Sequence, residues 1–284
     1  MRFFEFWRKR FSKFNLGSIV HGYTFHAWGN RAAVLVGLIS IWIIAYLSNP
    51  LTTAAFTFFP QEESEQAQQD TNKDTDFIEI FNGRSLEGWS GREGNWTVED
   101  GCIVGRTSAD NPIDRNTFLI WQGGELKDFE LRLQYRIESG NSGIQFRSRD
   151  LGNHHVAGYQ ADIDAENNYT GILYEEQGRG ILARRTQKIV RAKDGKSEVA
   201  ERPTCNEDEL LKSFKNSEDG WHDYVVVARG NRIIQQINGL TTIDFDDQEE
   251  GKAAKSGILA LQLHTGPPMK IAFRNIRLKH LQDE

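Results

Sequence analysis

The sequence predicts an all-β fold, a two-sheet antiparallel β-sandwich, on three observations. From Phe77 onward apolar residues recur at every second position, as in FELRLQYRI (129–137), YQADID (159–164) and ILALQLH (258–264). This is the period of half-buried antiparallel strands. Glycine, asparagine or aspartate breaks the pattern about every 8–12 residues, as expected for short strands joined by turns. The chain also has 17 Phe, 7 Trp and 7 Tyr, enough large side chains to fill a core between two sheets.

The N-terminal region, residues 1–59, is predicted to be a signal peptide or a membrane anchor built on a hydrophobic helix. Ala32–Leu47 is an uninterrupted apolar stretch, and six basic residues and one acidic residue precede it within 1–31. Its sixteen residues fall between the core of a cleaved signal, about 7–15 residues, and a membrane span, about 17–25. Cleaved signal, uncleaved anchor and buried core helix all stay open. Because basic flanks stay in the cytoplasm, we expect an exported protein, periplasmic or at the cell surface.

The rest of the chain divides into a linker and one domain. Residues 60–76 (PQEESEQAQQDTNKDTD) are acidic and have no aliphatic residue larger than Ala67, so we expect a disordered tether. Residues 77–281 form the predicted β-sandwich. Within it, residues 192–217 read as a polar insertion with one short helical stretch near Glu207–Phe214. The only cysteines, Cys102 and Cys205, lie far apart in the sequence, and their pairing stays open.

Composition and motifs exclude several function classes. The net charge is −6 and no basic stripe crosses the predicted domain, which argues against a nucleic-acid partner. HExxH, GxSxG, GxxxxGK[ST], GxGxxG and CxxC are all absent from the sequence. Zinc protease, α/β-hydrolase, P-loop and redox functions therefore lose their usual support.

Polar side chains that could bind a sugar alternate with apolar ones along three predicted strands. Since neighbours in a strand point to opposite faces, alternation sorts these side chains by face. Three polar sets should each share one face, and they are Gln145, Arg147 and Arg149; Gln160, Asp162 and Asp164; and Gln262 and His264. An ordinary solvated face is the alternative. Glutamine, arginine, aspartate and histidine, however, are residue types suited to hydroxyl networks, and Tyr159, Trp121 and Tyr174 could stack on a sugar ring.

Two adjacent pairs give weaker signals. His154 and His155 precede the Gln160 strand and read mainly as an exposed loop pair, with metal binding or proton transfer as the alternative. Of Glu175 and Glu176, which follow Tyr174, one should enter a cleft and the other should face water.

The order of short segments along the domain resembles the 3-keto-disaccharide hydrolase domain family. The matching segments are FNGRSLEGW (81–89), NWTVEDGCIVG (95–105), DFELRLQYRI (128–137), NSGIQFR (141–147), GYQADID (158–164), INGL (237–240), GILALQLH (257–264) and FRNIRLK (273–279). The resemblance covers about Phe77 to Lys279. It implies a concanavalin-like jelly roll with a sugar cleft on the concave sheet, and cleavage of glycosides whose glucose unit carries a ketone at C3.

Carried over residue by residue, the resemblance places Arg147, Gln160, Asp162, Tyr174, Glu175 and His264 in the cleft. Where many members have Glu-x-Gln, this chain has Gln160-x-Asp162, so the carboxylate is kept at a shifted position. We accordingly expect Asp162, His264 and Glu175 to be catalytic. The predicted substrate-binding residues are Arg147, Gln160, Tyr174, Gln262 and Tyr159.

The chemistry of a 3-keto-glycoside requires an acid, a base and a stabiliser of negative charge. A ketone at C3 acidifies the C2 hydrogen, so a base can form an enolate that expels the C1 oxygen, and water can then add. Asp162 or His264 could be the base, Arg147 or a bound divalent cation the stabiliser, and Glu175 or Tyr174 the acid. A direct glycosidase reaction with Asp162 and Glu175 as the pair is the fallback. A non-catalytic glycan-binding module and a structural protein stay as alternative functions, and oligomeric state and any metal stay open.

Overall fold

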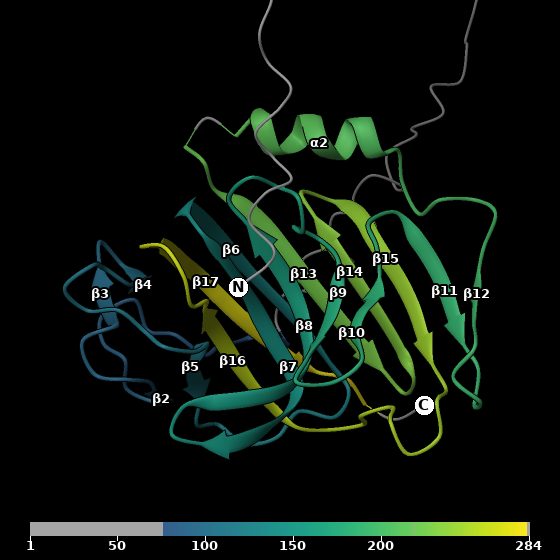
Figure 1. Cartoon of the computed structure of the whole chain (residues 1–284), viewed down its shortest axis with the longest axis horizontal. Coiled ribbons are helices and arrows are strands. Elements are labelled where there is room, and N and C mark those ends of the chain that lie inside the picture. The colour runs from purple at the N-terminus through teal and green to yellow at the C-terminus, as the bar shows by residue number, and fades with distance from the viewer. Residues whose placement is uncertain (1–75, 218, 283–284) are drawn as a thin grey trace, which may run out of the picture. The chain divides into compact units, whose positions relative to one another are not determined.

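The computed structural model describes residues 76–217 and 219–282, and these residues form two stacked β-sheets (Figure 1). The larger sheet has ten strands. In spatial order they are β12 (Ser197–Val199), β11 (Gln187–Arg191), β15 (Leu240–Asp247), β14 (Arg232–Ile237), β13 (His222–Arg229), β6 (Phe129–Ser139), β17 (Lys270–His280), β4 (Cys102–Arg106) and β3 (Trp96–Glu99), with β1 (Ile78–Glu79) pairing with β17.

The smaller sheet has seven strands and carries the polar residues singled out in the sequence. In spatial order they are β10 (Gly180–Ala183), β9 (Leu173–Glu176), β8 (His155–Asp164), β7 (Asn141–Gly152), β16 (Ile258–Leu263), β5 (Thr117–Trp121) and β2 (Trp89–Ser90). The predicted all-β two-sheet architecture is confirmed. The larger sheet is not purely antiparallel, because β11, the strand next to the edge strand β12, runs parallel to β15.

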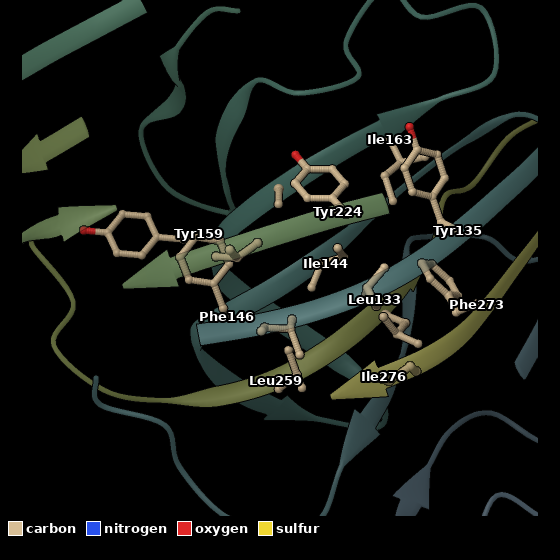
Figure 2. Close-up of a cluster of buried hydrophobic side chains, with 14 of the residues drawn as sticks. Leu133, Tyr135, Ile144, Phe146, Tyr159, Ile163, Tyr224, Leu259, Phe273 and Ile276 are labelled. Carbon is tan, nitrogen blue, oxygen red and sulfur yellow. The ribbon is translucent and has the colours of Figure 1, made fainter. Parts of the chain in front are cut away.

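The core lies between the sheets and uses the apolar face of each strand. Figure 2 shows Leu133, Tyr135, Tyr224, Phe273 and Ile276 of the larger sheet facing Ile144, Phe146, Tyr159, Ile163 and Leu259 of the smaller one. The rings of Phe146 and Tyr159 have centroids 5.7 Å apart. Neighbouring residues in a strand point to opposite faces, so the residues next to these core side chains point to the outer face of their sheet.

The polar insertion contains the one α-helix of the described residues, α2 (Glu207–Lys215), as the sequence predicts. Asn206 caps its first turn by accepting a hydrogen bond from the Glu209 amide, and three acidic residues follow. Leu210 and Phe214 are buried and join the core. The insertion also forms β12, which the sequence did not reveal.

The two cysteines, left open by the sequence, are both free thiols, Cys102 buried and Cys205 half-buried. The predicted N-terminal helix and the acidic tether up to residue 75 lie outside the described residues. Over 76–217 and 219–282 no helix has the length and apolar character of a membrane span.

The hairpin made by β7 and β8 bends back across the outer face of the smaller sheet. Register shifts interrupt its pairing between Phe146 and Arg149 and again between Asp150 and Gly152. The carbonyl of His154 then accepts a hydrogen bond from the Phe118 amide on β5, at 3.0 Å. Val156 packs with Phe118, Ile120, Ile258 and Ala260, which form a small apolar cluster on that outer face. The hairpin tip therefore covers β16 and β5 and leaves the outer face of β8 and β9 beside it.

Candidate active site

A row of three glutamines from neighbouring strands forms the floor of the site. Ser148 Oγ donates to Gln145 Oε1 and Gln145 Nε2 donates to Gln160 Oε1, both at 2.7 Å. Gln160 Nε2 donates to Gln262 Oε1 at 3.3 Å. Gly143 makes room for this row, because a Cβ there would lie 2.5 Å from Gln160 Cγ. All three glutamines are at most 2% exposed, so they support the site from beneath.

Asp162 lies next to this floor, two residues beyond Gln160 on the same face of β8. Its side chain is 6% exposed and accepts a hydrogen bond from Asn141 Nδ2 at 2.9 Å. Burial raises the pKa of the Asp162 carboxyl to about 7, and the nearby charges of Asp164 and Glu176 act in the same direction. A carboxyl with that pKa can take up and release a proton near neutrality.

Strand β9 adds a tyrosine and a second carboxyl to the same face. Its register pairs Tyr174 with Gln160 and Glu176 with Gly158, so both side chains share the outer face with Asp162. Glu176 is 7% exposed, and its Oε1 accepts a hydrogen bond from Asn116 Nδ2 at 3.2 Å. Burial raises the pKa of Tyr174, and the charges of Glu176 and Asp162 raise it further.

A cavity of about 490 Å³ opens between Glu176 and the hairpin tip, and Asp162 and Tyr174 are not among the residues that line it. Its walls come from the loop before β5, the β7–β8 tip, the end of β9 and the end of β16. They comprise Asp114, Arg115, Asn116, Phe118, Leu151, Gly152, Asn153, His155, Val156, Glu176, Gln177, His264 and Thr265. A volume of this size can hold a small ligand.

Asn116 joins three of these walls. Its Oδ1 accepts a hydrogen bond from the Thr265 amide at 3.0 Å, and its Nδ2 donates to Glu176. Its backbone carbonyl lies 2.9 Å from His155 Nδ1. The positions of Glu176, His155 and the end of β16 are thus set by one residue.

The alternation of the strands places most of the predicted residues correctly. Asp162, Gln160, Gln262 and His264 share the outer face of the smaller sheet, and Tyr174 lies with them. His264 is exposed and lines the cavity. Gln160 and Gln262, predicted to touch substrate, are instead buried in the floor.

Arg147 does not lie on this face, against the expectation from alternation. It sits in the bulge of β7 with a φ of 46°, and its guanidinium turns away to bind Asp128 Oδ1 at 2.8 Å. It also donates to the carbonyls of Lys127, Gly230 and Ala254. A β-bulge adds a residue and reverses the alternation beyond it, so the side chain is buried as part of the framework.

Tyr159 and Glu175 also point to the other side of their strands. Arg179 binds Glu175 at 2.6 Å and Asp247 at 2.7 Å, and the Tyr159 hydroxyl donates to the same Asp247. These groups form a charged cluster on the side of the smaller sheet that faces the larger sheet. The alternation of side chains along a strand already prevents Tyr174 and Glu175 from sharing a face, since they are adjacent in one strand.

Glu176, His155 and Asn116 line the cavity and were not among the predicted site residues. Glu176 could have been found by continuing the alternation from Tyr174 along β9. His155 reads as an exposed loop residue because nothing in the sequence shows that the hairpin folds back. Asn116 carries no sequence signal of its own, since its contacts all come from the tertiary fold.

Among the described residues, His, Cys, Asp and Glu side chains form no group of three or more that could hold a metal ion. The divalent cation that the sequence left open stays a prediction.

Comparison with known proteins identifies the domain. The model of the 3-keto-alpha-glucoside-1,2-lyase-like domain matches residues 76–279, which is most of the chain. The chain belongs to this family. Membership in the 3-keto-alpha-glucoside-1,2-lyase-like family confirms the resemblance found in the sequence and indicates a carbohydrate-active protein.

A curated relative and two solved structures show how far the likeness extends. A 3-keto-disaccharide hydrolase of Bacteroides thetaiotaomicron is 31% identical over 87 residues, covering 26% of this chain and 28% of the relative. The carbohydrate-binding module CBM66 of Bacillus subtilis is 16% identical with a TM-score of 0.44, covering 68% of this chain and 95% of that one. The laminarinase catalytic domain of Thermotoga maritima is 10% identical with a TM-score of 0.45, covering 73% of this chain and 97% of that one.

Proposed function

We propose that this domain cleaves 3-keto-glycosides, with Asp162 as the general base. The observation that carries the proposal is the buried Asp162 carboxyl, whose pKa of about 7 suits a base that removes a carbon-bound proton near neutral pH. The match of residues 76–279 to the 3-keto-alpha-glucoside-1,2-lyase-like domain supports the substrate class.

The proposed reaction has two steps. In the first, the Asp162 carboxylate takes the C2 proton, the C1=C2 double bond forms and the C1–O bond breaks, releasing the aglycone oxygen. In the second, the oxygen of water adds to C1, one proton of that water ends on the aglycone oxygen, and Asp162 returns its proton to C2, giving the free 3-keto-sugar and the aglycone alcohol. The net change is hydrolysis.

Negative charge gathers on the C3 oxygen as the C2 proton leaves. Arg147, the stabiliser expected from the sequence, is held by Asp128 and the framework carbonyls. Arg115 is the one Lys or Arg side chain among the described residues that line the cavity, and we propose that it takes this part.

An enzyme is favoured over a glycan-binding module by the two carboxyls. Asp162 and Glu176 are both nearly buried on one face, and burying charged groups is costly without a chemical use. A lectin-type site would instead present an open aromatic platform. A module that binds glucosides without turnover is the alternative outcome of the test.

The test compares the wild-type full chain with Asp162→Asn, Glu176→Gln and Glu175→Gln on a 3-keto-glucoside. We expect kcat/KM of the wild type to rise with pH through about 7, as Asp162 loses its proton. D162N should lose about 10²–10⁴-fold, which is typical for removal of an acid–base group. E176Q should also lose activity, whereas E175Q, one residue away and on the opposite face, should retain it.

Solvent isotope labelling separates elimination from a direct glycosidase reaction. In D2O the product should carry deuterium at C2, because the proton removed there exchanges before it returns. A product without C2 deuterium would favour direct hydrolysis by two carboxyls. Unimpaired turnover by D162N would overturn the proposal.

A further inference from the structure

We propose that the outer face of the larger sheet carries a second binding site, a groove that takes an acidic polysaccharide. Two cavities, of about 370 and 360 Å³, open on this face, and Gln236 lines both of them. Because they share this residue, the two cavities adjoin and form one trough, which we call the outer groove. It lies on the other sheet from Asp162, so this inference goes beyond the proposed function and does not depend on it.

A row of outward side chains runs along the outer groove and crosses five strands. The register pairs Arg277 of β17 with Arg132 of β6, and Arg132 with Val225 of β13. It continues from Val225 to Gln236 of β14 and then to Thr241 of β15. The residues on either side of the first four are buried, so those four side chains point away from the core. Four strand spacings make the row about 19 Å long, the length of about four linked sugar rings.

The lining of the outer groove combines oriented amides with apolar side chains, as the two kinds of surface on a sugar require. Gln134 Oε1 accepts a hydrogen bond from Asn275 Nδ2, and Gln134 Nε2 donates to Asp223 Oδ1, both at 2.9 Å. A sugar hydroxyl both donates and accepts, and an amide offers both kinds of partner. Val225 and Ile234 are half-buried in the same groove, where they offer an apolar surface to the C–H face of a ring.

The end of the outer groove near β11 carries an excess of positive charge. Lys188, Arg202 and Arg232 line it, against the single carboxyl of Asp244. Asp244 accepts two hydrogen bonds from Arg232, at 2.7 and 2.8 Å, and lies 3.4 Å from Lys188 Nζ. Arg202 is exposed, and its guanidinium has no ion-pair or hydrogen-bond partner within the described part of the chain. Thr204 anchors this segment, because its hydroxyl donates to a carbonyl of β15 at 2.7 Å. Arg202 is therefore placed to bind a carboxylate of a ligand.

The charges of the outer groove match a polysaccharide with an acid on about every second ring. The lining has five basic and three acidic side chains, which leaves an excess of two positive charges. About four rings with a carboxylate on every second one carry about two negative charges, which balances this excess. More densely charged polymers, such as sulfated glycans and nucleic acids, fit less well, because Glu130, Asp223 and Asp244 line the same groove and repel them. A neutral chain would leave Arg202 without a partner.

Hyaluronan oligosaccharides, which carry a carboxylate on every second ring, test the proposal with the full chain. By isothermal titration calorimetry, we expect affinity to rise from the disaccharide to the tetrasaccharide and to level off beyond it, because the groove holds about four rings. Arg202→Gln should raise the Kd of the tetrasaccharide about 10-fold, as the loss of a charge-assisted hydrogen bond does. It should leave the Kd of the carboxyl-reduced tetrasaccharide unchanged. Arg84→Gln is the matched control, because Arg84 is also exposed and lies outside both cavities, and it should change neither Kd.

Gln236→Ala tests whether the two cavities form one groove. Gln236 is half-buried, and its Nε2 donates one long hydrogen bond, to Thr241 Oγ1 at 3.4 Å, so the variant should keep its fold. We expect Q236A to weaken binding of the tetrasaccharide, which crosses the junction, more than binding of the disaccharide, which fits within one cavity. Equal weakening of both would show two separate sites and overturn the groove.

Other results that would overturn the inference are equally sharp. They are a wild type that binds none of the acidic oligosaccharides, an affinity that is the same for the disaccharide and the tetrasaccharide, and equal losses in R202Q and R84Q. The last result would show a general attraction of anions rather than a site. Turnover of a 3-keto-glucoside by R202Q should equal that of the wild type. A wild type that cleaves no 3-keto-glucoside would overturn the proposed function and leave the outer groove standing.

Discussion

Tyr135 and Tyr224 lie side by side in the core, with ring centroids 5.9 Å apart, and differ in the hydrogen bonding of their hydroxyls (Figure 2). The Tyr224 hydroxyl donates to Gln235 Oε1 at 2.8 Å. The Tyr135 hydroxyl is buried and has no partner among the described residues. A buried polar group without a partner lowers stability, because it gives up its hydrogen bonds to water.

This difference predicts opposite effects of the same substitution. Tyr135→Phe should leave the free energy of unfolding unchanged or raise it by up to about 1 kcal/mol. Tyr224→Phe should lower it by about 1–3 kcal/mol, because Gln235 loses the donor to its Oε1. Urea unfolding of the two variants measures both, and a larger loss in Y135F than in Y224F would contradict the account.

At the same scale, alternation could predict Asp162, Gln160, Gln262 and His264 because their strands are regular up to those positions. It could not give the depth of each side chain. Gln160 and Gln262 are buried, and burial depends on the packing of other segments over a strand, which the sequence of that strand does not show. Glu175, predicted to enter the cleft, binds Arg179 on the other side of β9, and its adjacency to Tyr174 in one strand already implies this placement.

Among the elements, the bulge in β7 has the largest effect on the site. It takes Arg147 out of the cleft and lets the hairpin tip turn over the sheet. Nothing in NSGIQFRSRD (141–150) marks the extra residue, because the bulge depends on the partner strands and on the buried acceptors that receive the guanidinium. The Arg147–Asp128 pair is nearly inaccessible, with side chains 1% and 8% exposed.

Arg147→Met tests whether this arginine belongs to the framework or to the substrate site. The variant leaves Asp128 buried without its countercharge, so we expect the free energy of unfolding to fall by about 3–5 kcal/mol. Arg149→Met, exposed and two residues away, should change it by less than about 0.5 kcal/mol. Thermal or urea unfolding makes the comparison. An R147M protein with wild-type stability and a raised KM would show that Arg147 contacts substrate, as the family resemblance implies.

For the whole molecule, the sequence could predict two packed sheets and the short helix, because periodicity, turn residues and capping are local signals. It could not predict the order of strands or the parallel pairing of β11 with β15. Those features depend on contacts between segments far apart in the chain, which a single sequence does not show.

The stability of the whole fold should carry the signature of Asp162. Its pKa is about 7 in the folded state against 3.8 for the free side chain. The folded state therefore binds the proton more tightly than the unfolded chain, and the free energy of unfolding falls as pH rises from about 4 through about 7.

Asp162→Asn removes this dependence. Relative to the wild type, D162N should gain stability between pH 4 and pH 8, by up to about 4 kcal/mol. Urea unfolding of both proteins at the two pH values isolates the difference, because all other titrating groups are shared. An equal pH dependence in the two proteins would show that the Asp162 carboxyl titrates as it does in water.

The β7–β8 hairpin supplies two glutamines of the floor, Gln145 and Gln160, and the neighbouring Asp162. It also supplies His155 and Val156 to the wall of the cavity. Its tip, Leu151–His154, carries none of the residues assigned to proton transfer. New tip sequences could therefore be exchanged to alter which aglycones are accepted, while the reacting groups keep their places. Divergence in substrate preference among relatives of this chain is expected to concentrate in these few positions.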